Sequence, residues 1–482
     1  MAERFPEHIA LAPDPSTQRS RDGRTLIGGS PLRLLRLTDA GARAAERVLA
    51  GDEVPTTGAE AIVARSLLDA GMAHPRPQVV PDLSVSVVVP VRDDPAGVAT
   101  LLDALGTHAE VVVVDDGSAD PGALHAVVAG RAAVLRHERS LGPGAARNTG
   151  WRAAAGDVIA FLDADVTPVG GWLPSLLGHL ADPRVGMVAP RVRSRPGPTG
   201  RERYERHRSP LDLGPAEARV VPRGRVSYVP SAALVCRRDV LEQLSGFDPD
   251  LRVGEDVDLV WRAIEAGWDV RYEPASIVEH RPRETWRALL RQRGAYGSAA
   301  APLDRRHAGA VAPVDLNAWS LGAWALAVAG GRRGMVAGAG VAVGSSLGLV
   351  PRLRGRADEP VAAALRLGGL GTLHAGTWLG RSVWRAWLPL ALVASVRSRR
   401  ARRATAVAAV VPALLDRRAA RGEERVALDP LRWTLLHATD QAAYCAGVWL
   451  GVVRERRIGA LRPRLSGIPR LGEMSDHQRS RG

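Results

Sequence analysis

The chain has 482 residues, enough for two to four domains, and 46% of them are hydrophobic, which excludes an intrinsically disordered protein. Its formal net charge is +14, and every basic residue is an arginine. The two cysteines, Cys236 and Cys445, lie far apart in the sequence, which excludes a disulfide framework and a cysteine-based metal cluster and suits a reducing compartment.

The positive charge is concentrated in the C-terminal part of the chain. Residues 281–482 contain 33 Arg and 13 acidic residues, a net charge of +20, whereas residues 1–280 have a net charge of −6. An excess of this kind is typical of a surface that meets nucleic acid or an anionic membrane. Because the first 30 residues lack the apolar core of a signal peptide, we expect a cytoplasmic protein, with peripheral attachment to the inner face of the cell membrane as an alternative.

Residues 1–80 are expected to form a small separate domain with its linker. Helices are predicted at residues 38–50, with Thr38 as N-cap, and at residues 59–70, and a proline-rich linker follows. The order of strand, turn, two helices and strand is similar to a winged-helix unit. Because the segment is not strongly basic, a structural role is favoured over docking of a substrate, and both over nucleic-acid binding.

Residues 81–300 alternate between short apolar strands and helices, which predicts an α/β domain with a largely parallel sheet. The first four strands are expected at residues 85–90, 111–114, 133–137 and 158–162, with helices at residues 95–105, 121–130 and 145–156. Further strands are expected at residues 185–190, 226–235, 269–273 and 277–280, and a helix at residues 254–266. Residues 191–225, rich in Arg, Pro and Gly, are expected to form a loop.

Acidic residues follow two of these strands. Asp115 and Asp116 follow the second strand, and Asp163 and Asp165 follow the fourth as a D-x-D pattern. The carboxyl ends of parallel strands are where α/β proteins bind ligands. Two carboxylates held there suit a hard divalent ion such as Mg²⁺ or Mn²⁺, which bridges protein oxygens to a substrate phosphate. A lone D-x-D more often marks a solvated turn, so the flanking motifs decide whether this one is read as a metal site.

Residues 301–482 are expected to be a basic, mostly helical region. Its most apolar segments are residues 316–330, 335–350, 367–380 and 407–415. We expect no confident membrane span, because such a span needs about 18–20 uninterrupted apolar residues. Trp378, Trp384 and Trp387 lie near arginines, a pattern typical of membrane interfaces. A soluble helical bundle and attachment to a membrane surface are equally favoured, and a membrane hairpin through residues 316–350 is a minor alternative.

Five motifs in order carry a family resemblance. They are V-S-V-V-V-P-V-R-D, V-V-D-D-G-S, G-P-G-A-A-R-N-T-G, F-L-D-A-D-V and G-E-D-V-D-L-V-W-R. Each is weak alone, but together they resemble the inverting family 2 glycosyltransferases over residues 83–295. The resemblance implies the GT-A fold of nucleotide-diphospho-sugar transferases and a hexosyltransferase that uses a UDP-sugar.

A narrower resemblance covers nearly the whole chain. The segments L-I-G-G-S-P-L-R-L-L-R-L and A-H-P-R-P and the basic C-terminal region are similar to the glycosyltransferases of the mycofactocin system. This implies transfer of glucose from UDP-glucose to premycofactocin, a peptide-derived redox cofactor, to build a β-1,4-linked oligoglucoside. A polyprenyl phosphate or cell-envelope glycan as acceptor remains an alternative. A nucleic-acid-binding protein is the alternative from another functional class. The set of acidic residues disfavours this alternative, so we expect no nucleic acid as a partner.

The resemblance assigns donor-binding roles. Asp115 or Asp116 would accept the uracil N–H, and Pro90 ends the neighbouring strand. Arg147, near a helix start, would meet uracil or phosphate, and Asp163 the ribose or the metal. Arg291 and Arg293 are expected in a segment that closes over the substrates, where either could meet the diphosphate.

The remaining roles concern the metal and the proton. Asp165 and His280 are the expected ligands of Mg²⁺ or Mn²⁺. Asp256 is the expected general base that takes the proton from the acceptor hydroxyl as its oxygen inverts the anomeric carbon. Glu255 and Asp258 are its rivals, and without the upstream motifs all three would be helix-start acids stabilised by the helix dipole.

Overall fold

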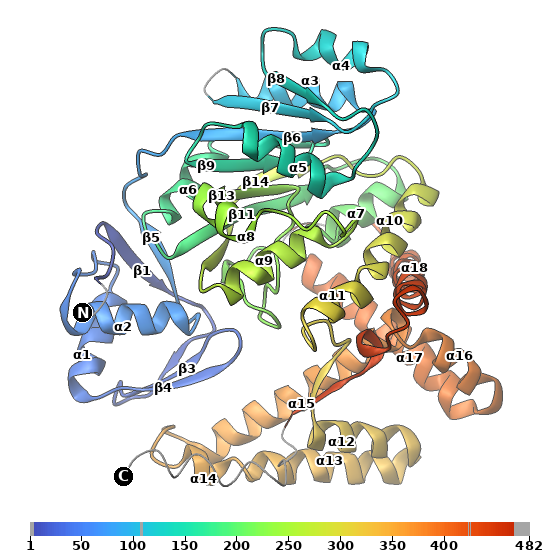
Figure 1. Cartoon of the computed structure of the whole chain (residues 1–482). Coiled ribbons are helices and arrows are strands. Elements are labelled where there is room, and N and C mark those ends of the chain that lie inside the picture. The colour runs from blue at the N-terminus through green and yellow to red at the C-terminus, as the bar shows by residue number, and fades with distance from the viewer. Residues whose placement is uncertain (1–3, 107–108, 423, 425, 467–482) are drawn as a thin grey trace. The chain divides into compact units, whose positions relative to one another are not determined.

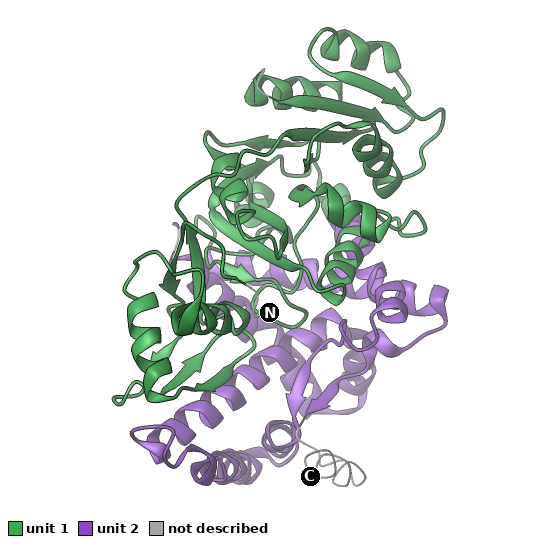
Figure 2. Cartoon of the chain, turned by 60° about the vertical axis from the view of Figure 1, so that its left-hand side comes forward, with its two compact units in different colours: residues 1–289, 426–428 green, residues 290–425, 429–482 purple. Residues whose placement is uncertain are grey.

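A computed structural model describes residues 4–106, 109–422, 424 and 426–466, so the expected C-terminal region is described only as far as residue 466. The chain divides into two compact units (Figure 2). The first contains Met1–Leu289 with Val426–Leu428, and the second contains Leu290–Arg425 with Asp429–Gly482. The division falls inside helix α10 (Trp286–Ser298), near the end of the expected catalytic domain.

The N-terminal part of the first unit contains two helices and two small sheets (Figure 1). Its elements are β1 (Ile9–Pro13), β2 (Gln18–Arg19), β3 (Thr25–Gly28), β4 (Arg33–Arg36), α1 (Asp39–Val48), α2 (Gly58–Asp69) and β5 (Ala73–Pro77). β1 pairs antiparallel with β5, and β2, β3 and β4 form a meander. Thr38 caps α1 as predicted, because its Oγ1 accepts the Gly41 N–H at 3.1 Å. Leu26, Leu67 and Met72 are fully buried in this domain's own core.

The rest of the first unit surrounds a nine-stranded mixed sheet in the order β10-β14-β11-β13-β9-β6-β7-β8, with β12 beside β14. The strands are β6 (Val85–Val91), β7 (Glu110–Asp115), β8 (Ala133–Arg136), β9 (Val158–Leu162), β10 (Val166–Pro168), β11 (Val185–Ser194), β12 (Ala218–Arg219), β13 (Ala233–Arg237) and β14 (Asp269–His280). The helices are α3 (Pro95–Leu105), α4 (Pro121–Val128), α5 (Pro143–Ala153), α6 (Trp172–His179), α7 (Gly200–Arg208), α8 (Arg238–Leu244) and α9 (Glu255–Glu265). This confirms the α/β class.

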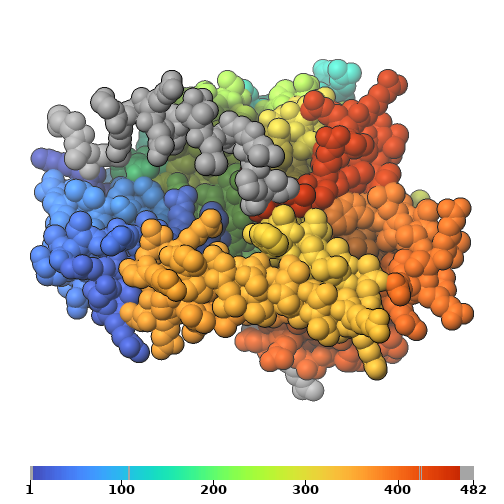
Figure 3. Space-filling model, turned by 90° about the horizontal axis from the view of Figure 1, so that it is seen from below, coloured from blue at the N-terminus to red at the C-terminus, as the bar shows by residue number. Residues whose placement is uncertain are grey.

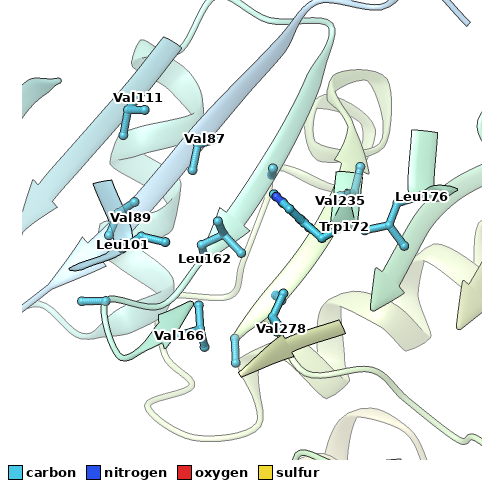
Figure 4. Close-up of a cluster of buried hydrophobic side chains, with 14 of the residues drawn as sticks. Val87, Val89, Leu101, Val111, Leu162, Val166, Trp172, Leu176, Val235 and Val278 are labelled. Carbon is cyan, nitrogen blue, oxygen red and sulfur yellow. The ribbon is translucent and has the colours of Figure 1, made fainter. Parts of the chain in front are cut away.

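The first four predicted strands form the parallel half of this sheet. β6 pairs in parallel with both β7 and β9, and β7 with β8. One face of the sheet packs against helices through a core in which Val87, Leu162 and Val278 lie near Trp172 and Leu176 (Figure 4). Because β6 and β9 are covered on both faces, they are nearly continuous apolar runs.

Three local predictions need correction. Residues 191–225 are not one loop: β11 extends to Ser194, and α7 follows, held by a capping box between Thr199 and Glu202. The strand expected from residue 226 begins only at Ala233. The two expected pieces at residues 269–280 are one strand, whose pairing with β11 shifts register before Ile277.

Within the residues described, the second unit is helical apart from one short strand pair, β15 (Asp315–Asn317) with β16 (Arg464–Ser466). Besides most of α10, its helices are α11 (Ala300–Arg306), α12 (Ala318–Ala329), α13 (Gly331–Leu347), α14 (Val350–Leu353), α15 (Pro360–Arg385), α16 (Leu388–Arg397), α17 (Arg399–Ala420), α18 (Pro430–Glu455) and the 3₁₀ turn η1 (Gly459–Leu461).

One helix in the described part of the chain, Gly331–Leu353, is long and apolar enough to cross a membrane by length and composition. It extends beyond the apolar segment expected at residues 335–350, and a single such helix does not amount to a confident span. It comprises α13, which ends at Leu347 with Gly348 as its C-cap, and α14, which begins at Val350. Only 17% of its most apolar stretch is buried.

Candidate functional site

The carboxyl ends of β6, β7 and β9 bring the predicted acids to one edge of the sheet. Val91 at the end of β6 pairs with Asp115, and Phe161 near the end of β9 pairs with Val88. Pro90, predicted to bind the donor, is half-buried and is the second-to-last residue of strand β6. The Asp163 N–H donates to the carbonyl of Ala232, which ends β9 at the sheet edge.

Arg147 on α5 joins two of these acids. Its guanidinium donates to Asp163 Oδ1 at 2.6 Å and to Glu255 Oε1 at 2.9 Å, and lies 5.5 Å from the ring centre of Phe247. Burial opposes the charge of this side chain, but Asp163 and Glu255 outweigh burial and raise the pKa of Arg147 above its ordinary value. Arg147 is therefore a permanent cation that connects the end of β9 to the start of α9.

Asp256 lies beside this cation at the first turn of α9. Its carboxylate accepts the backbone N–H of Val257 at 2.8 Å and that of Ser231 at 3.3 Å. Burial raises the pKa of Asp256, and Arg147 opposes the rise. A carboxylate with a raised pKa is a better proton acceptor than an ordinary one, as a general base requires.

The two rival acids are held differently. Burial, together with the charge of Asp256, raises the pKa of Glu255 to about 7, while Arg147 lowers it. Asp258 is 2% exposed and accepts from Arg262 Nε at 2.7 Å. Asp256 accepts from backbone amides, whereas Glu255 and Asp258 each accept from an arginine.

Asp165 and His280 face each other where β10 pairs with β14. Asp165 Oδ2 lies 3.3 Å from His280 Nε2, and Val166 is the register partner of His280. Burial opposes ionisation of Asp165, but His280, then Arg283 and Arg281, outweigh it and lower the pKa of this carboxyl below its ordinary value. Asp165 is therefore ionised at neutral pH, and its oxygens could hold a metal ion.

The donor set of this pair fits a divalent ion that is shared with a substrate. Within the described residues, no cluster of three or more His, Cys, Asp and Glu that could hold a metal is present. One carboxylate and one imidazole leave most positions of Mg²⁺ or Mn²⁺ for diphosphate oxygens and water. Two arginines after β14 had no assigned role: Arg283 lies 3.2 Å from Asp165, and the Arg281 N–H donates to the Asp165 carbonyl at 2.9 Å. The basic sequence H-R-P-R at the end of β14 was the signal for them.

Asp115 and Asp116 organise the loops around this edge. Asp115 is fully buried and accepts the Ser118 N–H at 2.8 Å and the guanidinium of Arg136. Asp116 accepts four hydrogen bonds, from the side chains of His137 and Ser140 and from two backbone N–H groups, those of Leu141 and Gly142. Four donors occupy all the lone-pair positions of a carboxylate. A uracil N–H would therefore share or displace one of them, and the uracil role stays a prediction.

Asn148, next to Arg147, is a site residue whose role the sequence did not reveal. Its side chain donates to the Phe247 carbonyl at 2.7 Å and accepts the Phe247 N–H at 2.9 Å, so one amide pairs with both polar groups of a peptide. Gly246 has φ +74°, and a Cβ there would lie 2.2 Å from Asn148 Oδ1. Asn148 thus fixes the turn before α9, and the motif G-P-G-A-A-R-N-T-G contains it without indicating this partner.

Arg291 and Arg293 belong to the second unit. Arg293 is 3% exposed, and its Nε donates to Asp440 on α18. Their expected contact with the diphosphate stays a prediction.

Three comparisons with known proteins bear on this site. The family model Glycosyl transferase family 2 matches residues 86–245. A pre-mycofactocin glycosyltransferase of Mycobacterium tuberculosis is 43% identical over 473 residues, which cover 96% of this chain and 99% of the relative. The glycosyltransferase AglE of Haloferax volcanii is 28% identical over 218 residues, 43% of this chain and 70% of the relative. A solved mannosyltransferase of Pyrobaculum calidifontis, in complex with GDP-Man and Mn²⁺, is 21% identical, covers 61% of this chain and 90% of its own, and has a TM-score of 0.37.

Proposed function

Because the chain belongs to the pre-mycofactocin glycosyltransferases of family 2, an enzyme family with the GT-A fold, we propose that it transfers glucose from UDP-glucose to premycofactocin. Successive transfers would build a β-1,4-linked oligoglucoside. The support is the identity to the Mycobacterium tuberculosis relative over nearly the full length of both chains.

The observation that carries the mechanism is the pair of contacts made by Arg147, which link Asp163 to the helix start that presents Asp256. Asp256 takes the proton of an acceptor hydroxyl, and that oxygen forms a bond to the anomeric carbon of glucose. The bond from this carbon to the diphosphate oxygen breaks, and UDP leaves with the electron pair. Attack opposite the leaving group inverts the carbon and gives a β-linkage from an α-linked donor.

The donor is assigned to the edge formed by β6, β7 and β9. Pro90, Asp115 and Asp116 would surround the uracil, and Arg147 and Asp163 would meet the phosphate and ribose. Arg291 and Arg293 remain candidates for the diphosphate. The permanent charge of Arg147 supports this assignment, since an anionic leaving group needs a fixed cation nearby.

Asp165 and His280 would hold Mg²⁺ or Mn²⁺. When bound, such an ion neutralises the charge that develops on the departing diphosphate. Arg281 and Arg283 keep Asp165 ionised and add positive charge at the same place.

The test is a turnover assay with the purified full chain, UDP-glucose, premycofactocin and either metal. UDP release and the mass of the product are measured for the wild type and for Asp256→Asn. We expect additions of one or more hexoses with the wild type and none with the variant. Absence of turnover with any UDP-sugar and either metal would overturn the proposal.

A second candidate acceptor is a polyprenyl phosphate or cell-envelope glycan, favoured by the exposed apolar helices of the second unit. UDP release without a glycosylated premycofactocin product, together with transfer to a polyprenyl phosphate, would favour it. With either acceptor we propose a cytoplasmic enzyme that has a membrane surface as a partner of its second unit.

A further inference from the structure

The second unit exposes far more large apolar side chains than the first. Of the 35 exposed large hydrophobic residues in the described part of the chain, 27 lie in the second unit. On α13 they include Met335, Val336 and Val343, which are 62%, 75% and 50% exposed. Val336 and Val343 are seven residues apart and therefore lie on one face of the helix. Large apolar side chains exposed together on one helix face indicate a surface that binds something other than water.

The hairpin of α12 and α13 is built with small residues inside and large residues outside. A Cβ on Gly334 would lie 2.1 Å from the Leu326 carbonyl oxygen, and one on Gly338 would lie 2.4 Å from that of Ala323. Glycine therefore lets the two backbones touch, while Val336 faces outward. In water the opposite arrangement is favoured, with large apolar side chains between the helices and small or polar residues outside. Helices packed through small residues with large apolar side chains outward are typical of a lipid environment.

Helix lengths and charges show how such a hairpin would lie. α12 has 12 residues and is about 18 Å long, much shorter than the roughly 30 Å hydrocarbon core of a bilayer. Arg332 and Arg333, both exposed, lie in the first turn of α13, directly after the bend that joins it to α12, so their charges oppose entry of this bend into the hydrocarbon. The hairpin therefore fits the interface plane, with its ends in the headgroup region.

Arginines flank these helices at three places, all of them exposed. They are Arg332 and Arg333 in the first turn of α13, Arg352, Arg354 and Arg356 around the end of α14, and five arginines within residues 397–403, where α16 is followed by α17. Residues 330–415 contain only two acids, Asp358 and Glu359. In Figure 3 the yellow-to-orange atoms of α12 to α15 spread across the face toward the viewer. Apolar helices bordered by arginine complement an anionic bilayer.

We propose that the α12–α13 hairpin of the second unit lies in the interface of an anionic phospholipid bilayer, with Val336 and Val343 inserted and Arg332 and Arg333 at the headgroups. The occupant is the lipid surface, not a second copy of the chain. This proposal deepens the proposed function, because it names the lipid and the protein surface that form the membrane contact. It rests only on the membrane partner proposed there and not on the proposed glycosyl transfer.

The test is co-flotation of the full chain with vesicles of phosphatidylglycerol and phosphatidylcholine, or of phosphatidylcholine alone. We expect the mixed vesicles to bind the protein at least about tenfold more tightly, with a clear loss at high salt. Val336→Glu/Val343→Glu should abolish flotation, and Arg332→Glu/Arg333→Glu should weaken it at least about tenfold. The matched controls are Ile62→Glu, 64% exposed in the first unit, and Arg33→Glu/Arg36→Glu on β4, which should leave flotation unchanged.

UDP release is measured on each variant without vesicles, which separates this proposal from that of glycosyl transfer. An active protein that ignores anionic vesicles, or that binds both kinds of vesicle equally, would overturn the membrane proposal and leave the transferase intact. Light scattering after size exclusion tests whether a second copy of the chain covers this surface instead of lipid. The lipid assignment is wrong if the wild type does not float with vesicles but forms a dimer, and Val336→Glu/Val343→Glu is a monomer.

Discussion

At the scale of single residues, one arginine sets the electrostatics of the candidate site. Arg147 is buried and bonded to Asp163 and Glu255, and Asp256 lies within its field. Burial alone would neutralise these acids, and Arg147 limits that effect. Asp256 is thereby a carboxylate of raised pKa beside a fixed cation, and it is the proton acceptor that we propose.

Asp256→Asn should lower kcat by about 10²–10⁴-fold, because it removes the general base and keeps the size of the side chain. The affinity for UDP should change less than about threefold, since Asp256 makes its described contacts with backbone amides. Steady-state kinetics and calorimetric titration of UDP measure the two effects. Asp258→Asn is the matched control on the same helix, and a larger loss of kcat there would shift the base to Asp258.

The pH profile of kcat/KM should show an acidic limb whose midpoint lies above the ordinary Asp value of 3.8. As the pH falls through the raised pKa of Asp256, the base becomes protonated and the rate falls. Glu255→Gln should move this limb to lower pH, because it removes a negative neighbour and leaves more of the Arg147 charge for Asp256. Glu265→Gln, at the far end of α9, should leave the limb in place. An unmoved limb in Glu255→Gln would contradict the coupling.

At the scale of elements, the site depends on how α5 is joined to the turn before α9. Asn148 pairs with both backbone polar groups of Phe247, and the ring of Phe247 packs edge-on against Phe161 at 5.2 Å. Through this connection α5, which follows β8 in the chain, holds in place the turn that leads to Glu255 and Asp256.

Asn148→Ala should lower the free energy of unfolding by about 2–3 kcal/mol, because it leaves the buried N–H and C=O of Phe247 without their partner. It should also lower kcat more than it raises KM for UDP-glucose, since the turn that positions Asp256 loosens. Urea unfolding and steady-state kinetics measure these effects. Asn317→Ala, which removes the α12 N-cap in the second unit, is the control that should change stability without changing kcat. Equal kcat in Asn148→Ala and wild type would contradict the positioning role.

At the scale of the whole molecule, an ion pair ties the N-terminal domain to the segment between β12 and β13 of the catalytic domain, within the first unit. Asp14 is buried and bound by His74 at 2.8 Å and by Arg225 at 2.8 Å and 3.1 Å. Burial opposes the charge of Asp14, but Arg225, Ser16 and His74 outweigh it and hold its pKa well below the ordinary value. The carboxylate therefore stabilises the folded state while it is ionised.

Asp14→Asn should lower the free energy of unfolding by roughly 3 kcal/mol at pH 7, because Arg225 loses its buried partner. A depressed pKa contributes stability above the ordinary carboxyl pKa, and that stability is lost as the pH falls below it. The difference in the free energy of unfolding between wild type and variant should therefore shrink below about pH 4, since the ordinary pKa of an Asp carboxyl is 3.8. Denaturant unfolding at several pH values tests this, and a gap that stays constant with pH would contradict it.

The amino-acid sequence by itself determined the α/β class, the apolar strands of the parallel half and the acids that follow them. These features are local, because strand runs, caps such as Thr38 and turns depend on neighbouring residues. Tertiary structure alone decided which charges meet: Arg147 with Asp163 and Glu255, Asp165 with His280, and Arg293 with Asp440. Such pairs depend on strand order and helix packing, which bring distant segments together in ways that no local pattern specifies.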